Sequence, residues 1–149
     1  MEQDSTSNLM NILKNASEKD VRQYYEQHIN DKSYASFTAY MDDLIAQKQF
    51  KRQDILARAD IPQKYGYKLL TGESHTTDRD KILRICIAMK LSLKEAQRAL
   101  TLYGMQPLYP KNKRDVVFII AFNKGISSVS DINQRLTELH LPELSTSPY

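Results

Sequence analysis

Apolar residues recur three and four positions apart along most of this 149-residue chain, in short segments that open on helix-capping residues. Only four glycines and five prolines interrupt the pattern, and no clear strand-like alternation of polar and apolar residues stands out. The periodicity therefore predicts an all-α fold of seven or eight helices. The clearest apolar stripe, on a helix of about four turns, consists of Phe37, Tyr40, Met41, Leu44 and Ile45.

Capping signals predict where several of these helices begin and end. Thr77 to Asp80 and Ser92 to Glu95 both have the polar-x-x-acid form of a capping box, in which a hydroxyl and a carboxylate satisfy unpaired amides. Gly104 and Gly125 each follow an apolar segment, and glycine is the usual residue just past a helix C-terminus. We therefore expect helices to start at both boxes and to stop at both glycines.

The last third of the chain predicts two more helices and a tail. A helix from Lys113 to Asn123 is apolar almost all round, which is typical either of a core helix or of half of an interface. Core packing is the simpler interpretation, and a dimer seam is the alternative. Ser128 opens the last helix, and residues 145–149 are expected to form a frayed tail. The apolar face of this last helix would hold Ile132, Leu136 and Leu139.

Several classes of protein and of site are disfavoured. The longest apolar run, Val116 to Phe122, falls far short of the roughly twenty residues that cross a bilayer. The N-terminus is acidic and polar, unlike a signal peptide. A single cysteine, Cys86, cannot form an internal disulfide, and three scattered histidines lack metal-ligand spacing. No catalytic motif occurs. We expect a cytoplasmic protein that is not an enzyme, with no metal, no cofactor and no membrane partner.

Positive charge is concentrated in the middle of the chain. Residues 51–114 carry fourteen Lys and Arg against six Asp and Glu, a net charge of +8, while residues 1–50 carry −3 and residues 115–149 carry −2. A local excess of this size indicates a polyanionic partner such as nucleic acid. Solvated helix faces are the alternative interpretation.

The most informative stretch is residues 52–72. A short helix is predicted to end near Ala59, a tight turn covers Asp60 and Ile61, and Pro62 suits the first position of a second helix that ends at Gly72. Two short helices joined by a few residues, the second basic and polar on its outer face, are typical of a protein that reads the DNA major groove.

With the downstream pattern Leu91-Ser92-Leu93, this stretch resembles the Cro/lambda-repressor-type (Xre) helix-turn-helix family over residues 36–102. The whole chain is also similar to a group of small Gram-positive helix-turn-helix proteins, which implies a bacterial protein. The resemblance implies a five-helix core with helices at 36–49, 52–59, 62–71, 78–89 and 92–103. It divides the chain into an N-terminal helical segment (1–33), a helix-turn-helix DNA-binding-like domain (34–104), and a C-terminal helical hairpin with a tail (105–149).

The resemblance also implies a set of DNA-contacting residues. Gln63, Lys64 and Lys68 fall where base-reading side chains project in this family. Glutamine can pair with adenine, and lysine can donate hydrogen bonds to guanine. Arg52 falls where a phosphate contact is usual, and phosphate contacts set the register of the protein on the duplex.

Further contacts are implied at the end of the second helix and after it. Thr71, Ser74 and His75 lie in the loop that approaches the DNA backbone in the family. Tyr67, like Tyr65, can stack on a sugar or base, or can instead pack against the N-terminal helices or another protein.

Two positions depart from the family pattern. The family usually has a small residue in place of Leu56 and an aliphatic residue in place of Gly66. These positions face each other inside the motif, so a small/large pair is exchanged here for a large/small pair, and volume-conserving exchanges of this kind are commonly tolerated. We expect the fold to survive and the DNA-reading surface to be altered.

Two functions fit these observations. The first is a DNA-binding transcriptional regulator that inserts residues 62–71 into the major groove of double-stranded DNA. The alternative is a protein–protein adaptor that keeps the fold without sequence-specific DNA binding and uses Tyr65 and Tyr67 against a protein partner. Two other contacts also fit: a homodimer through the helix at 113–123, and a protein partner bound by the acidic N-terminal 33 residues.

Overall fold

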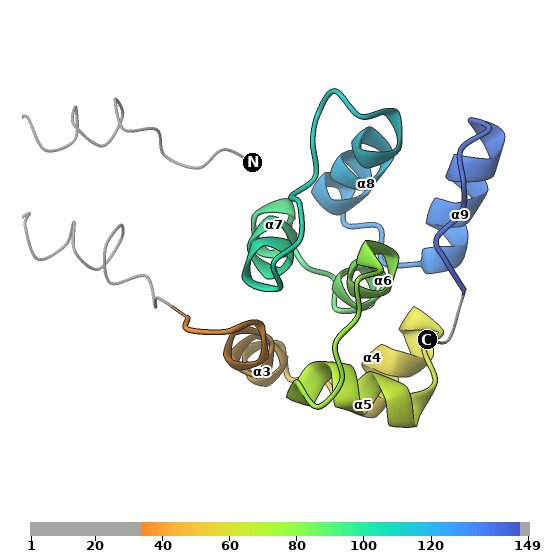
Figure 1. Ribbon diagram of the computed structural model, residues 1–149. Coiled ribbons are helices and arrows are strands. Elements are labelled where there is room, and N and C mark those ends of the chain that lie inside the picture. The colour runs from red at the N-terminus through yellow and green to blue at the C-terminus, as the bar shows by residue number, and fades with distance from the viewer. Residues whose placement is uncertain (1–33, 147–149) are drawn as a thin grey trace, which may run out of the picture. The chain divides into compact units, whose positions relative to one another are not determined.

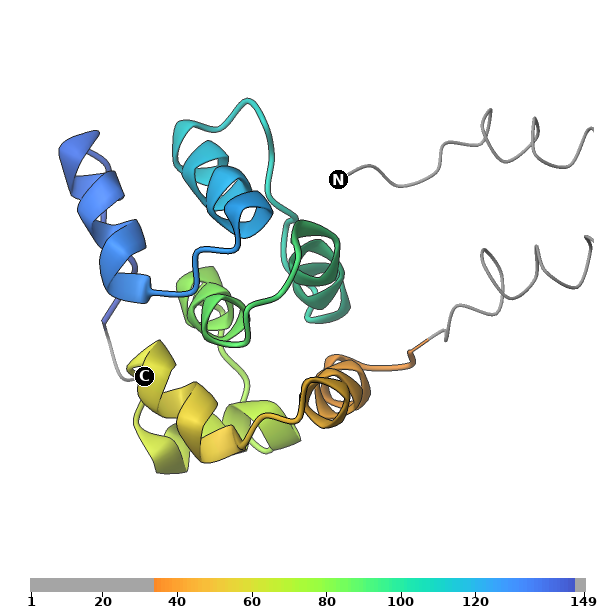
Figure 2. The same ribbon diagram turned by 180° about the vertical axis from the view of Figure 1, so that it is seen from behind.

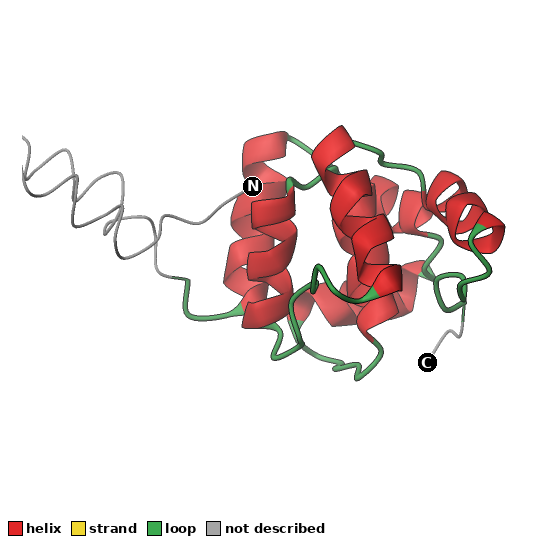
Figure 3. Ribbon diagram, turned by 90° about the horizontal axis from the view of Figure 1, so that it is seen from above, coloured by secondary structure: helices red, strands yellow, loops and turns green. Residues whose placement is uncertain are grey.

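The computed structural model describes residues 34–146, and every regular element in that part is a helix (Figures 1 and 3). The all-α prediction is confirmed for these residues. The chain divides into two units, Met1–Ala35 and Ser36–Tyr149, and the predicted N-terminal helical segment lies outside the described residues. The helices are α3 (Phe37–Lys48), α4 (Arg52–Ala59), α5 (Gln63–Thr71), α6 (Arg79–Ala88), α7 (Leu93–Leu102), α8 (Lys113–Lys124) and α9 (Val129–Glu138).

Helix α6 is the centre of the described unit. Every residue from Lys81 to Met89 is buried, because α4, α7 and α9 all pack against it (Figure 1). Cys86 lies in the middle of this segment, and complete burial raises the pKa of its thiol to about 12. A thiol of this kind behaves as a small apolar core residue. The whole predicted stripe of α3 is also buried, which confirms that expectation.

The turn between α4 and α5 follows the prediction closely. Asp60 has the left-handed conformation, with φ of 55°, and its N–H donates to the Ala57 carbonyl at 3.2 Å. The N–H of Ile61 donates to the Leu56 carbonyl at 3.1 Å, which completes a Schellman-type helix end. One detail was wrong: Pro62 precedes α5 as its N-cap residue, with ψ of 131°, and is not the first helical residue.

One of the two predicted capping boxes forms and the other does not. The Ser92 hydroxyl accepts from the Glu95 N–H at 3.2 Å, and the Glu95 carboxylate accepts from the Ser92 N–H at 2.9 Å. At the start of α6 the prediction was wrong, because Asp78 is the N-cap residue and accepts from the Asp80 N–H at 3.0 Å. The Asp80 carboxylate, expected to complete that box, points to another helix.

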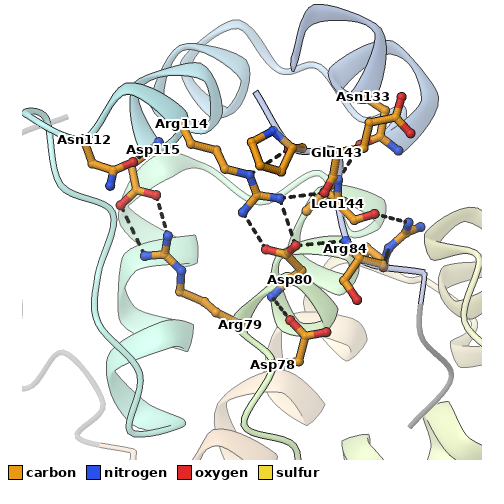
Figure 4. Close-up of polar contacts among 12 residues, drawn as sticks. Asp78, Arg79, Asp80, Arg84, Asn112, Arg114, Asp115, Asn133, Glu143 and Leu144 are labelled. Carbon is orange, nitrogen blue, oxygen red and sulfur yellow. Dashed lines mark hydrogen bonds and ion pairs between the residues drawn. The ribbon is translucent and has the colours of Figure 1, made fainter. Parts of the chain in front are cut away.

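The Asp80 carboxylate binds Arg114 of α8. Two Arg-Asp pairs, Arg79-Asp80 in the first turn of α6 and Arg114-Asp115 in the first turn of α8, interact crosswise (Figure 4). Arg114 donates to both carboxylate oxygens of Asp80, at 2.8 Å each. Arg79 forms the reciprocal ion pair with Asp115, which is buried and also accepts the Tyr109 N–H at 3.0 Å. The crosswise pairs fasten the first turn of α8 to the first turn of α6.

The C-terminal segment differs from the expected frayed tail. Leu144 is buried, and Ser145 donates its N–H to Asp80 at 2.9 Å, so the chain up to this point is held against the helices. Residues 147–149 lie outside the described residues. Leu139 lies just past the end of α9 at Glu138 and is 59% exposed. The predicted apolar face of α9 therefore ends at Leu136 and does not include Leu139.

Candidate nucleic-acid interface

Helix α5 lies along one edge of the described unit, beside α4 (Figures 1 and 2). Its inner side is formed by Gly66, Leu69 and Leu70, which are buried against α3 and α4. Five of the other positions form a polar outer face, on which Gln63, Lys64 and Thr71 are exposed and Tyr67 and Lys68 are half-buried.

We call these five residues the outer face of α5. Within it, the Gln63 amide donates to the Tyr67 hydroxyl at 3.3 Å. The structure thus brings the three predicted base-reading residues onto one face of one short helix. Lys64 and Lys68 are one helical turn apart on that face, because residues at i and i+4 are neighbours.

The close packing of α5 on α4 depends on the contact between Gly66 and Leu56. A Cβ atom placed on Gly66 would lie 2.4 Å from Leu56 Cδ2, well inside van der Waals contact. Leu56 is itself fully buried. The prediction that these two positions face each other is confirmed, and the leucine side chain occupies the space that a larger residue at Gly66 would need.

The two tyrosines of α5 point in different directions. The Tyr65 ring lies over the ammonium group of the buried Lys81 of α6, with 5.7 Å between the nitrogen and the ring centroid. Tyr67 lies on the outer face. Only Tyr67 therefore shares a face with the predicted base-reading residues, and Tyr65 packs toward the core.

Arg52, the predicted phosphate contact, begins α4 and forms an ion pair with Asp42 of α3. Its side chain keeps 38% of its surface exposed. Lys51, which is not among the contacts that the sequence implies, is an exposed residue at the N-cap position of the same helix. The sequence does contain a sign of this position: Lys51 stands directly before α4, where a cation replaces the usual capping side chain.

The loop after α5 is anchored at both ends. The Ser74 N–H donates to the Lys68 carbonyl at 3.0 Å, and the Thr71 hydroxyl donates to the same carbonyl at 3.3 Å. The His75 ring stacks on Tyr103, the residue directly after α7, with ring centroids 4.5 Å apart. Thr71, predicted to lie in the loop, is the last residue of α5, and the loop therefore begins at the opposite end of a nine-residue helix, about 13 Å long, from Gln63.

Helices α4 and α5 also share a feature at their N-termini. Neither Lys51 nor Pro62 supplies a side-chain capping bond. The other helices of the described part all begin with a side chain that accepts a first-turn N–H, as Ser36 and Asn112 do. First-turn amides without a side-chain acceptor are donors suited to an anion.

Much of the positive charge of residues 51–114 is used inside the molecule. Every arginine in this segment makes an internal contact: with a carboxylate (Arg52, Arg79, Arg114), with main-chain carbonyls (Arg58, Arg84), or with an aromatic ring (Arg98). Exposed lysines therefore carry most of the charge that a partner would meet. Sequence counting alone does not separate the two kinds of cation.

Comparison of the chain with protein-family models, with curated proteins and with solved structures gives no match. Over residues 34–146, no helix is long and apolar enough to cross a membrane. In the same residues no group of three or more His, Cys, Asp and Glu is arranged to hold a metal ion.

Proposed function

We propose that this protein is a bacterial, cytoplasmic DNA-binding transcriptional regulator of the Cro/lambda-repressor type, in which α5 enters the major groove of double-stranded DNA. The observation that carries the proposal is the outer face of α5. Gln63, Lys64 and Lys68 project from a short helix at the edge of the fold, joined to α4 by a tight turn. A helix of this kind fits a major groove about 12 Å wide.

The proposed chemistry divides the contacts by role. Gln63 pairs with adenine, and Lys64 and Lys68 donate to the O6 and N7 atoms of guanine. Binding requires the Gln63 amide to exchange its bond with the Tyr67 hydroxyl for one with a base, so Tyr67 is freed to contact a sugar or phosphate.

The remaining predicted residues would hold the DNA backbone. Arg52 and the uncapped first turn of α5 face phosphates at one end, and Thr71, Ser74 and His75 at the other. In this proposal helices α3 to α7 form the five-helix DNA-binding domain at 34–104, and the C-terminal helices at 105–149 support it.

The test is fluorescence anisotropy of the full chain with a labelled duplex across a series of salt concentrations. The logarithm of the association constant falls with the logarithm of salt concentration by about 0.9 per phosphate contact. Arg52 on the backbone and Lys64 and Lys68 in the groove each bring one cation against the duplex, and each is expected to neutralise about one phosphate charge, whether it contacts a base or the backbone. These three cations predict a slope of roughly −3 per copy, and the Lys64→Ala/Lys68→Ala variant should bring it to about −1.

The matched control is Lys94→Ala/Lys111→Ala, which removes two exposed lysines from α7 and from the α7–α8 connection. It should leave the slope unchanged. A slope near −7 would mean that the whole +8 excess meets the DNA, contrary to the internal contacts of the arginines. A folded protein that does not bind at low salt would rule out the regulator.

A second candidate is the protein–protein adaptor that lacks sequence-specific DNA binding. The observation in its favour is the internal use of every arginine in residues 51–114, which leaves a weaker polyanion surface than the sequence indicates. Tyr67 on the outer face would then be the main contact with the protein partner. Tyr65 would contribute indirectly, through its packing against Lys81. Crosslinking at Tyr67 in cell extract, with Lys94 as the control position, would distinguish a protein partner from a duplex.

A further inference from the structure

Residues 142–146 form what we call the C-terminal strap, a segment without helix that runs back against α6. Leu144 is its only buried residue. The N–H of Leu144 donates to the Asn133 side chain of α9 at 2.8 Å, and the N–H of Ser145 donates to Asp80 of α6 at 2.9 Å. The strap is therefore held through its main chain, through the buried Leu144 side chain, and through the Glu143 carboxylate, which accepts from the Thr137 hydroxyl of α9 at 2.7 Å (Figure 4).

Two arginines bind the carbonyl groups of the strap. Arg114 donates to the carbonyls of Pro142 at 2.9 Å and Glu143 at 3.0 Å. Arg84 donates to the carbonyls of Leu144 at 3.0 Å and Ser145 at 2.8 Å.

Arg84 makes one more bond, and it leads to the candidate interface. Its Nη1 donates to the carbonyl of Ala59 at 3.0 Å, and Ala59 is the last residue of α4 before the turn at Asp60. The negative end of the α4 dipole meets the guanidinium there. One buried cation, 3% exposed, thus joins the strap to the end of α4.

Removing the strap would leave Arg84 with one of its three carbonyl acceptors. A buried guanidinium that loses its acceptors is strongly unfavourable, so α6 and the end of α4 would have to move to let water reach it. The space that the buried Leu144 side chain fills would be exposed to water at the same place.

We propose that the C-terminal strap is a positioning element for the α4–α5 turn, and that Arg84 transmits its effect. The strap holds the guanidinium in the orientation that supports the Ala59 carbonyl, and this support sets the direction in which α5 leaves the turn. The consequence for DNA affinity rests on the proposed function, whereas the effect on the turn does not.

The test compares two buried leucines that lie in irregular segments and are clamped by side chains. Leu144→Ala loosens the strap. The matched control is Leu108→Ala, at a residue whose N–H and carbonyl are both bound by Gln97 of α7, at 2.6 and 2.9 Å. Amide hydrogen exchange is measured in the full chain, without DNA, at Asp60 and Ile61.

Leu144→Ala should speed exchange at these two amides about tenfold relative to Leu108→Ala, the size of change expected from losing a hydrogen bond to a charged group. Leu108→Ala should instead speed exchange at the amides of Tyr103 and Met105, which follow the C-terminal end of α7. Equal exchange at the turn in both variants, or no change in either, would overturn the proposal.

Arg84→Lys gives an independent measurement if Leu144→Ala does not fold. Lysine keeps the charge but has no planar fork to join three carbonyls, so the same two amides should exchange faster while α7 is unaffected. Anisotropy with the labelled duplex then separates the two hypotheses. Faster exchange at the turn in a chain that never binds DNA would refute the regulator and leave the strap's role intact.

Discussion

At the scale of single residues, the contact between Leu56 and Gly66 sets how closely α5 approaches α4. Glycine in a helix interior normally costs about 1 kcal/mol relative to alanine. Here that cost is offset by the space that Gly66 leaves for a fully buried leucine. Local helix propensity and core packing therefore favour different residues at this position, and packing decides.

A double-mutant cycle at these two residues tests this balance. We expect Gly66→Ala to lower the free energy of unfolding by about 1–3 kcal/mol through overpacking, and Leu56→Ala to lower it by about 2–5 kcal/mol. The double variant should lose less free energy of unfolding than the sum of the two single losses, because the added methyl group fills part of the space left by leucine. Urea unfolding followed by circular dichroism measures all three. Strict additivity would show that the two side chains do not compete for space.

At the scale of elements, α8 shows how an almost wholly apolar helix is used. Phe118 is fully buried and Val117, Ala121 and Phe122 join it in the core, which confirms the core interpretation for that face. Ile120 points outward and is 43% exposed. This outer side keeps the dimer seam as a proposal that rests on the proposed function, because regulators of the proposed type commonly bind paired half-sites as dimers.

Two substitutions on α8 separate these roles. Phe118→Ala should lower the free energy of unfolding by about 3–5 kcal/mol, while Ile120→Lys should change it by no more than about 0.5 kcal/mol. Sedimentation of the wild type and of Ile120→Lys tests the homodimer: a dimer that dissociates in the variant would place the seam on α8. A wild type that sediments as a monomer, or a variant that remains dimeric, would contradict it.

At the scale of the whole molecule, Asp80 joins three parts of the chain. It opens α6, binds Arg114 of α8, and accepts the Ser145 N–H from the C-terminal strap. Burial alone would raise the pKa of this carboxyl, but the hydrogen bond and charge of Arg114 together with the Ser145 amide outweigh burial and hold the pKa below its usual value.

This pKa makes the stability of the fold sensitive to acid. Because the folded pKa lies below the unfolded value of about 3.9, the contribution of Asp80 is fully present well above that value and is lost as pH falls through the folded pKa. We expect Asp80→Asn to be less stable than the wild type at pH 7 and to lose less stability between about pH 5 and pH 3.

Urea unfolding at pH 7, 5 and 3 provides the measurement, with Asp131→Asn as the control, at an exposed carboxylate in the first turn of α9. The control should follow the wild type across the whole range. Parallel pH dependence in the wild type and Asp80→Asn would mean that the carboxylate is not what couples the helices to the strap.

What the sequence by itself determined is local. The bounds of α3 to α9 to within a residue or two, the tight turn at Asp60 and the Ser92 capping box all depend on residues within about four positions of one another, a distance over which caps and periodicity act. The outer face of α5 belongs to the same class, because helical periodicity alone places Gln63, Lys64 and Lys68 together.

What only the tertiary structure decided is the use of the polar side chains over long separations. Asp80 and Arg114 are brought together from 34 positions apart, and Arg84 meets the strap from 60 positions away. Local pattern therefore assigned Asp80 to a capping box and residues 145–149 to a tail. A charged side chain binds whichever opposite charge or free carbonyl the packed helices bring within reach, and that choice is made only once the apolar faces have set the positions of the helices.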